Sequence, residues 1–229
     1  MPYLLHIETS THVCSVAISD NEQILGCKET YDGDHVKHLN PLIRGILEET
    51  QLNIQQLSGV SISNGPGSYT SLRAGMAAAK GICFALDIPL FQISTLEALC
   101  YGGRVRMGMP ELKHFIPMLD ARRENVYLGL YTKLGEMIIQ PQLFNIQEDI
   151  FSMVQILATD TLIVGNGAQK WFGKHPETQA RVLDILCSAT FLAIPAFNLY
   201  RHGSSSDLNS CIPDYMKDPN ITTPKAKQS

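Results

Sequence analysis

The sequence has no pair of cysteines at the C-x-x-C spacing, and its six cysteines are scattered over 229 residues. This distribution argues against a zinc cage and against a dense disulfide framework, so we expect reduced thiols in a cytoplasmic protein. A block of basic residues is also missing, because 18 lysines and arginines stand against 22 acidic residues and the formal net charge is −4. We therefore expect no extended positive surface for binding nucleic acid, and a role in RNA binding would need a partner that supplies the positive charge.

Long hydrophobic runs are absent as well. The most apolar stretch, residues 76–91, is broken by Lys80 and Asp87, so we expect no membrane-spanning segment. The N-terminal MPYLLHIETS has no basic region and carries His6 and Glu8, which is not the pattern of a signal peptide. The final DPNITTPKAKQS is polar and broken by proline, which predicts a frayed tail. Composition otherwise fits a globular chain of two domains or one large one, with 45% hydrophobic and 17% charged residues.

Motifs for hydrolysis or for a P-loop are missing, since neither G-x-S-x-G nor H-E-x-x-H occurs. The glycine-rich NGPGSYTSLRAG, residues 64–75, lacks the lysine of a Walker motif until Lys80, and Thr70 replaces the third glycine of a dinucleotide fingerprint. Backbone N–H groups at a helix start, with the hydroxyls of Ser68 and Thr70, could still receive an anion. A plain turn from strand to helix, made by Gly65, Pro66 and Gly67, explains the same residues equally well.

An internal repeat is the main feature that is present. Residues 3–18 predict a hairpin with acidic Glu8 at its tip, and residues 114–131 predict a second hairpin with Asp120 at the same place. In each half a strand then leads through an Asn-Gly turn into a helix, as in GVSISNGPGS and TLIVGNGAQK. Because the hairpin and the strand–turn–helix pattern both recur, and in the same order, the sequence favours a duplicated α/β unit. We place the domain boundary in YGGRVRMGMP, which gives domains 1–103 and 104–229, and we expect the last helix to pack back on the first domain.

Two helices can be placed from their apolar periodicity. One is predicted over residues 36–52, with Pro41 early in it. Its apolar stripe, which should face a core, consists of Val36, Leu39, Leu42, Ile43, Ile46 and Leu47. The helix after the glycine turn has small residues on two neighbouring faces, in addition to a larger apolar stripe from Leu72 to Leu86. A helix that is apolar nearly all round needs cover from two directions, and we expect the second cover to be another protein chain. A further helix is predicted to start with a capping box of Ser94 and Glu97.

Three sets of polar residues are candidates for chemistry. Glu8 with Thr9 and Ser10 could hold a Mg–nucleotide, but an acidic residue at a hairpin tip more often satisfies local N–H groups. Histidines 35 and 38 have a metal-binding spacing without an evident third ligand, so we expect no metal there. The segment from Asp120 to Glu124 could combine a catalytic acid with anion-binding arginines, and a solvated turn with local ion pairs is the simpler interpretation.

The ordered motifs resemble the bacterial tRNA threonylcarbamoyladenosine biosynthesis family TsaB, also called YeaZ-type or glycoprotease-like. The matching blocks, which span almost the whole chain, are IETSTHVCSVAIS, HLNPLI, NGPGSYTSLRAGMAAAKGICFALDIPLFQISTLEAL, DARRENVY and IPDYMKD. This resemblance implies the actin/Hsp70/sugar-kinase (ASKHA) fold, built from two ribonuclease-H-like domains. The chain departs from many relatives in carrying Glu8 in place of Asp and Ser71 in place of Gly, of which only the first bears on a nucleotide site.

The resemblance also implies a role. The catalytic paralogue TsaD carries a metal-binding His-Met-Glu-Gly-His run where this chain has TLEAL, residues 95–99, so both histidines are missing. It implies a subunit with no catalytic residue and no metal, which binds and activates TsaD; a self-standing metalloprotease-like or ATP-dependent enzyme of the same fold is the alternative. The other implied partners are a TsaE-like ATPase, tRNA through the complex and a second copy of the chain, with ATP and Mg at an interface as the one conceivable cofactor. The interface residues carried over are Leu39, Leu42, Ile43, Tyr69, Arg73, Ala74, Ala77 and Ala78.

Overall fold

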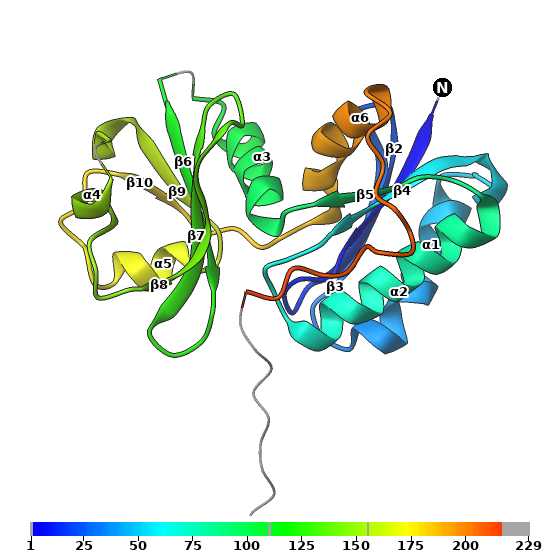
Figure 1. The fold of residues 1–229 in the computed structure, drawn as a ribbon, viewed down its shortest axis with the longest axis horizontal. Helices are drawn as coiled ribbons and strands as arrows, with labels where there is room; N and C mark the ends of the chain where they lie inside the picture. Colours follow the sequence, from blue (N-terminus) through cyan, green and yellow to red (C-terminus); the bar gives the residue numbers. More distant parts are fainter. Residues whose placement is uncertain (1, 110, 155, 217–229) are drawn as a thin grey trace, which may run out of the picture.

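The computed structural model describes residues 2–109, 111–154 and 156–216, which form two five-stranded mixed sheets side by side (Figure 1). The first sheet has the order β3-β2-β1-β4-β5. Its strands are β1 (Tyr3–Glu8), β2 (Cys14–Asp20), β3 (Gln23–Thr30), β4 (Leu57–Ser63) and β5 (Leu90–Ile93). The central β1 pairs antiparallel with β2 and parallel with β4, so a hairpin is followed by a crossover.

The second sheet repeats this arrangement with the order β10-β9-β6-β7-β8. Its strands are β6 (His114–Asp120), β7 (Asn125–Thr132), β8 (Met137–Asn145), β9 (Thr161–Val164) and β10 (Arg181–Leu183). Here β6 pairs antiparallel with β7 and parallel with β9, as β1 does with β2 and β4. The repeated α/β unit predicted from the sequence is therefore confirmed.

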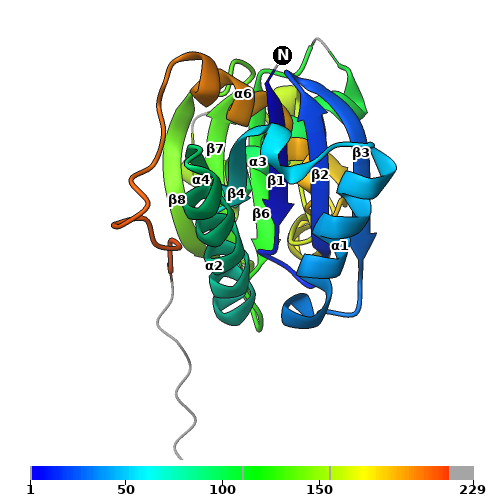
Figure 2. The ribbon, with the colours of Figure 1, turned by 90° about the vertical axis from the view of Figure 1, so that its right-hand side faces the viewer.

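Helices cover both faces of both sheets (Figures 1 and 2). The helices are α1 (His35–Glu49), α2 (Tyr69–Leu86), α3 (Thr95–Met107), α4 (Ile150–Met153), α5 (Ala168–Phe172) and α6 (Ala193–Arg201), with 3₁₀ turns η1 (Ile54–Gln56), η2 (Ala158–Asp160) and η3 (Ala189–Leu192). The pair α1 and α2 covers the outer face of the first sheet, α3 and α6 lie between the sheets, and α4 and α5 cover the outer face of the second. No helix in the described part of the chain has the length and apolarity to cross a bilayer.

Strand β1 is buried on both faces, which explains its nearly continuous apolar sequence. Leu4 packs into the core between the two sheets, together with Phe91 of β5 and residues of α3 and α6. Leu5 and Ile7 point the other way, into the core under α1 and α2. The chain thus builds continuous apolar layers on either side of its central strand.

The two halves exchange helices across the middle layer. Helix α3 packs on β6, β7 and β9 of the second sheet, whereas α6, from the C-terminal half of the chain, packs on β1 and β5 of the first. The predicted boundary between residues 103 and 104 falls inside α3, and the division into two domains stays a prediction.

Two local expectations need correction. The helix predicted over residues 36–52 runs from His35 to Glu49, with Asp34 as N-cap accepting a hydrogen bond from the Lys37 N–H. Val36, assigned to its buried stripe, is 73% exposed, because it lies in the first turn on the side away from the sheet. The predicted frayed tail begins at residue 218, outside the described residues.

His6 is a buried polar residue whose ring is fixed between two serines. Its Nδ1 lies 2.7 Å from Ser61 Oγ and its Nε2 lies 2.8 Å from Ser19 Oγ. Because the Ser19 hydroxyl donates to the Asn21 carbonyl oxygen, Nε2 must donate to Ser19 and Nδ1 must accept from Ser61. The ring is therefore neutral in the Nε2–H tautomer, and burial lowers its pKa from 6.5 to about 3.

This pKa predicts an acid-sensitive fold. Between pH 6.5 and about 3 the unfolded chain takes up a proton at His6 that the folded chain refuses. The residue therefore removes about 1.4 kcal/mol of unfolding free energy for each unit that pH falls below 6.5. Urea unfolding of the wild type and of His6→Gln at pH 7, 6 and 5 measures this as a pH-dependent difference between the two proteins. A difference that stays constant over this range would contradict the assignment.

Candidate functional site

The glycine turn between β4 and α2 is packed against other chain segments on two sides. Gly65 has φ +120°, a conformation that favours glycine, and a Cβ there would collide with the backbone of Asp214. A Cβ on Gly67 would lie within 3.0 Å of several atoms of Ser10. The Ser68 N–H donates a 2.7 Å hydrogen bond to the Ser10 carbonyl oxygen, so the amide at the helix start is used within the chain. These contacts match the turn interpretation of the motif.

The acidic tip at Glu8 lies directly beneath this turn. Glu8, Thr9 and Ser10 are buried, and Glu8 Oε1 accepts a 2.6 Å hydrogen bond from the Ser10 N–H. Burial raises the pKa of the Glu8 carboxyl, and the hydrogen bond from the Ser10 N–H opposes that rise. Thr9 packs against Gly75 of α2, where a side chain would have no room. Glu8 Oε2, Thr9 Oγ1 and Ser10 Oγ are buried without a hydrogen-bond partner among the described residues, so the nucleotide hypothesis for these three residues stays a prediction.

The other polar candidates lie apart from one another. His35 is buried with its ring nitrogens against the carbonyl oxygens of Gly33 and Val13, whereas His38 pairs with Asp32 at 2.6 Å. Within the described ranges no three His, Cys, Asp or Glu side chains are grouped so that they could hold a metal ion.

The second hairpin tip, Asp120 to Glu124, forms local contacts. Asp120 accepts from Lys170 Nζ at 2.6 Å and from the N–H of Arg122, and its own N–H donates to Asn166. The solvated turn with an ion pair is the interpretation that fits these contacts.

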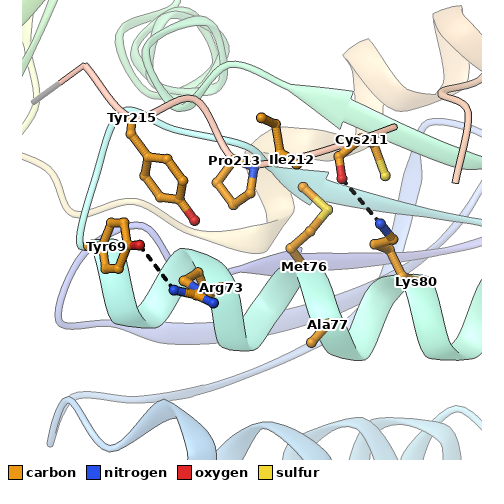
Figure 3. Close-up of a pocket in the computed structure, with 9 residues that line it drawn as sticks. All are labelled: Tyr69, Arg73, Met76, Ala77, Lys80, Cys211, Ile212, Pro213 and Tyr215. Carbon is orange, nitrogen blue, oxygen red and sulfur yellow. Dashed lines mark hydrogen bonds between the residues drawn. The ribbon is translucent and has the colours of Figure 1, made fainter. Parts of the chain in front are cut away.

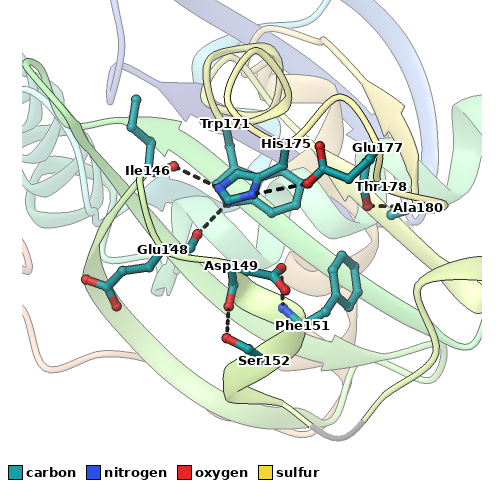
Figure 4. A network of polar contacts seen from close by, with 10 residues as sticks. All are labelled: Ile146, Glu148, Asp149, Phe151, Ser152, Trp171, His175, Glu177, Thr178 and Ala180. Carbon is teal, nitrogen blue, oxygen red and sulfur yellow. Dashed lines mark hydrogen bonds and ion pairs between the residues drawn. The ribbon is translucent and has the colours of Figure 1, made fainter.

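A further polar network holds the outer layer of the second sheet together (Figure 4). The ring of His175 stacks on Trp171 with centroids 4.3 Å apart, and its Nε2 lies 3.0 Å from the Ile146 carbonyl oxygen. The Trp171 indole N–H donates to the Glu148 carbonyl oxygen. Because these contacts end on backbone oxygens of one loop, the network fixes that loop against α5.

The predicted interface residues fall into three groups on the neighbouring helices α1 and α2 (Figure 2). Leu39 and Ile43 are buried in the core of the first sheet, so no partner reaches them while the fold is intact. The half-buried residues are Leu42, Ala74 and Ala78, of which Leu42 and Ala78 pack against the edge of the same core. Exposed positions are Tyr69, Arg73 and Ala77.

The exposed side of α2 carries more apolar surface than the motif indicated. Leu72, Met76 and Cys83 cover the sheet, as their spacing predicts. On the opposite side Phe84 is 83% exposed, and a Cβ on Gly81 would meet nothing within 4 Å. The second apolar face thus has no cover within the described chain. Sequence reasoning passed over Phe84, although it lies three residues after Gly81 on the same side of the helix.

A groove of about 570 Å³ runs beside α2 (Figure 3). One wall is α2 itself, and the other is an extended segment, residues 206–216, that we name the C-terminal strap. Its lining residues are Tyr69, Arg73, Met76, Ala77, Lys80, Cys211, Ile212, Pro213 and Tyr215. The groove is mostly apolar and has two cationic side chains on its helix wall.

Specific contacts hold the strap in place along α2. Tyr69 and Tyr215 pack with ring centroids 4.6 Å apart, and the Tyr69 hydroxyl accepts a hydrogen bond from Arg73. Lys80 Nζ donates to the Cys211 carbonyl oxygen at 3.2 Å. Sequence reasoning did not place the strap beside α2, because no periodicity links an extended C-terminal segment to a distant helix.

Comparison with known proteins identifies the family. The family model described as TsaD, tRNA N6-adenosine threonylcarbamoyltransferase, matches residues 29–220, most of the chain. The chain belongs to the TsaD family, in its TsaB (YeaZ-type) branch. It is 26% identical over 226 residues to the tRNA threonylcarbamoyladenosine biosynthesis protein TsaB of Bacillus subtilis, covering 93% of each chain.

Solved structures agree with the TsaB branch. YeaZ from Pseudomonas aeruginosa superposes with a TM-score of 0.78 at 25% identity, over 94% of this chain and 100% of that one. An activator of 2-hydroxyisocaproyl-CoA dehydratase from Clostridium difficile shares the fold, with a TM-score of 0.55 at 11% identity over 88% of this chain and 96% of that one. The fold is the actin/Hsp70/sugar-kinase type that the sequence predicts.

Substitution by alanine should change the unfolding free energy in opposite directions at Gly67, in the glycine turn, and at Gly81, in helix α2. Gly67→Ala should lower the unfolding free energy by about 3 kcal/mol, because the new methyl group meets the Ser10 backbone. Gly81→Ala, in open space on α2, should raise it by up to about 1 kcal/mol through helix propensity. Urea unfolding measures both, and equal effects would show that the turn does not pack as described.

Proposed function

We propose that this chain is a non-catalytic subunit of the tRNA N6-threonylcarbamoyladenosine-forming complex, and that it binds and activates a TsaD-like transferase through α1 and α2. The observation that carries the proposal is the uncovered apolar face of α2, with Ala77, Gly81 and Phe84, next to the groove. Membership of the TsaB branch supports the link to threonylcarbamoyladenosine formation, since the Bacillus subtilis relative is named for it.

The chemistry of this face suits protein docking. Ala77 and Gly81 let another backbone approach closely, and Phe84 adds a large side chain whose full burial contributes about 1.5–3 kcal/mol. Aromatic and arginine side chains such as Tyr69 and Arg73 are the types that contribute most at the centres of interfaces. The same face would serve a second copy of this chain when the transferase is absent.

Packing at the start of α3 supports a non-catalytic role. This segment takes the place of the metal-binding helix turn of the catalytic paralogue. Thr95, Leu96 and Leu99 are 0% exposed, and both leucines belong to the core between the sheets. These three side chains stabilise the fold and are not available to a substrate. The transferase would therefore supply the reacting groups, with a TsaE-like ATPase and ATP–Mg joining at an interface of the complex and tRNA bound through the partners.

Ala77→Arg should abolish docking without disturbing the fold. Ala77 is exposed in the isolated chain, so the arginine is solvated there, but it would be buried without a partner in the complex. The cost of an isolated buried charge is about 3–5 kcal/mol, which weakens binding by at least about 100-fold. Co-purification with the co-expressed TsaD-like protein, followed by a tRNA modification assay, measures the loss. Ala78 is a poorer choice, because it packs partly against the core.

Gln169→Arg is the matched control, since Gln169 is exposed on α5 of the second sheet. This variant should co-purify and support modification as the wild type does. Unchanged association of Ala77→Arg would place the docking surface elsewhere. Modification of tRNA by the metal-loaded chain alone would overturn the non-catalytic role and favour the enzyme alternative.

A further inference from the structure

A second cavity, of about 420 Å³, lies between the two halves of the chain and has no role in the proposed docking. Four chain segments wall it: the end of β4, the start of α3, the β7–β8 hairpin and the C-terminal strap. The residues that line it are Asn64, Ser94, Glu97, Tyr131, Gly135, Met137, Gln140, Pro141 and Asp214. Its size is in the range of pockets for small organic molecules.

The start of α3 directs two unused polar side chains to this cavity. Ser94 and Glu97 have the spacing of a capping box, but the Ser94 side chain forms no capping bond. The Thr95 N–H at this helix end donates to the Gly65 carbonyl oxygen. Ser94 and Glu97 line the cavity in place of capping each other. The predicted capping box is therefore wrong.

Glu97 is the residue that lacks a partner. Glu97 is half-buried, and no described residue donates a hydrogen bond to its carboxylate or forms an ion pair with it. Burial raises the pKa of this carboxyl, and the charge of Arg104 lowers it without a direct contact. The Arg104 guanidinium is held elsewhere, by a hydrogen bond to the Thr132 carbonyl oxygen and by packing on Tyr101 and Phe115. A carboxylate that is partly removed from water and has no donor in the described chain would be stabilised by a cationic ligand.

The remaining lining is polar on one side and apolar on the other. Asp214 provides a second carboxylate, and no lysine or arginine is among the residues that line the cavity. The Tyr131 side chain is 3% exposed, so its phenol is fixed in the wall. Met137 and Pro141 of the β7–β8 hairpin supply apolar surface.

We propose that this cavity binds a small organic cation, an amine or a guanidinium, whose N–H groups donate to Glu97. Asp214 adds negative potential at the strap side, and the hydrocarbon part of the ligand packs on Met137 and Pro141. Donation from a cation to a carboxylate is among the stronger hydrogen bonds in proteins. The site is separate from the exposed face of α2, so this proposal stands or falls independently of the docking role.

Isothermal titration with n-butylguanidinium and with n-butylurea tests the charge requirement on the full chain. The two probes have nearly the same shape, and only the first is a cation. We expect butylguanidinium to bind at least about tenfold more tightly than butylurea, the range of a charge-assisted hydrogen bond. Equal affinities, or no binding of butylguanidinium at all, would overturn the proposal.

Two variants localise the binding. Glu97→Gln keeps the shape and removes the charge, and it should weaken butylguanidinium binding at least about tenfold while leaving butylurea unaffected. Glu22→Gln, at an exposed position between β2 and β3, is the control and should bind as the wild type does. Thermal unfolding checks that both variants fold. Retained affinity in a folded Glu97→Gln protein would show that the cation binds elsewhere.

Discussion

The hydrogen bond from the Ser68 N–H to the Ser10 carbonyl oxygen fixes the start of α2, the helix for which we propose a docking role. It requires the backbone at Gly67 to touch the β1–β2 turn, which only a residue without a side chain allows. The same turn holds α3, since the Gly65 carbonyl oxygen accepts from the Thr95 N–H. Residues 64–68 therefore set the start of both helices, one facing outward and one facing the second sheet. The glycine-rich turn therefore has a packing role that positions both helices.

The C-terminal strap joins the two surfaces to which roles are proposed. Backbone contacts hold it along the first sheet, where Ser206 N–H donates to the Leu90 carbonyl oxygen and Asp214 N–H to that of Asn64. Tyr215 and its neighbours face the groove beside α2, and Asp214 lines the cavity between the halves. The two sites are thus physically adjacent although they use different chemistry.

Much of the fold follows from the sequence because its signals are local. Alternating and continuous apolar runs predict both hairpins, and the glycine turn predicts the start of α2. The exposure of Val36 and the missing capping bond at Ser94 were not predictable from the sequence, since each depends on how the helix end packs in the complete fold. At the site, α2 was identified by its small residues. The burial of Leu39 agrees with its place in the apolar stripe of α1, and it conflicts with the interface assignment that the family resemblance implied.

The repeated unit gives the chain two unlike surfaces in one fold. Each half presents a sheet with helices on both faces, and the middle layer uses one helix from each half to bury the shared core. At the start of α3 the leucines at positions 96 and 99 belong to that core, so this helix turn stabilises the fold. Glu97 lies between them in sequence but on the other side of the helix, facing the cavity. The position between the two leucines can therefore carry a carboxylate toward the cavity, because the core needs only the residues on either side of it.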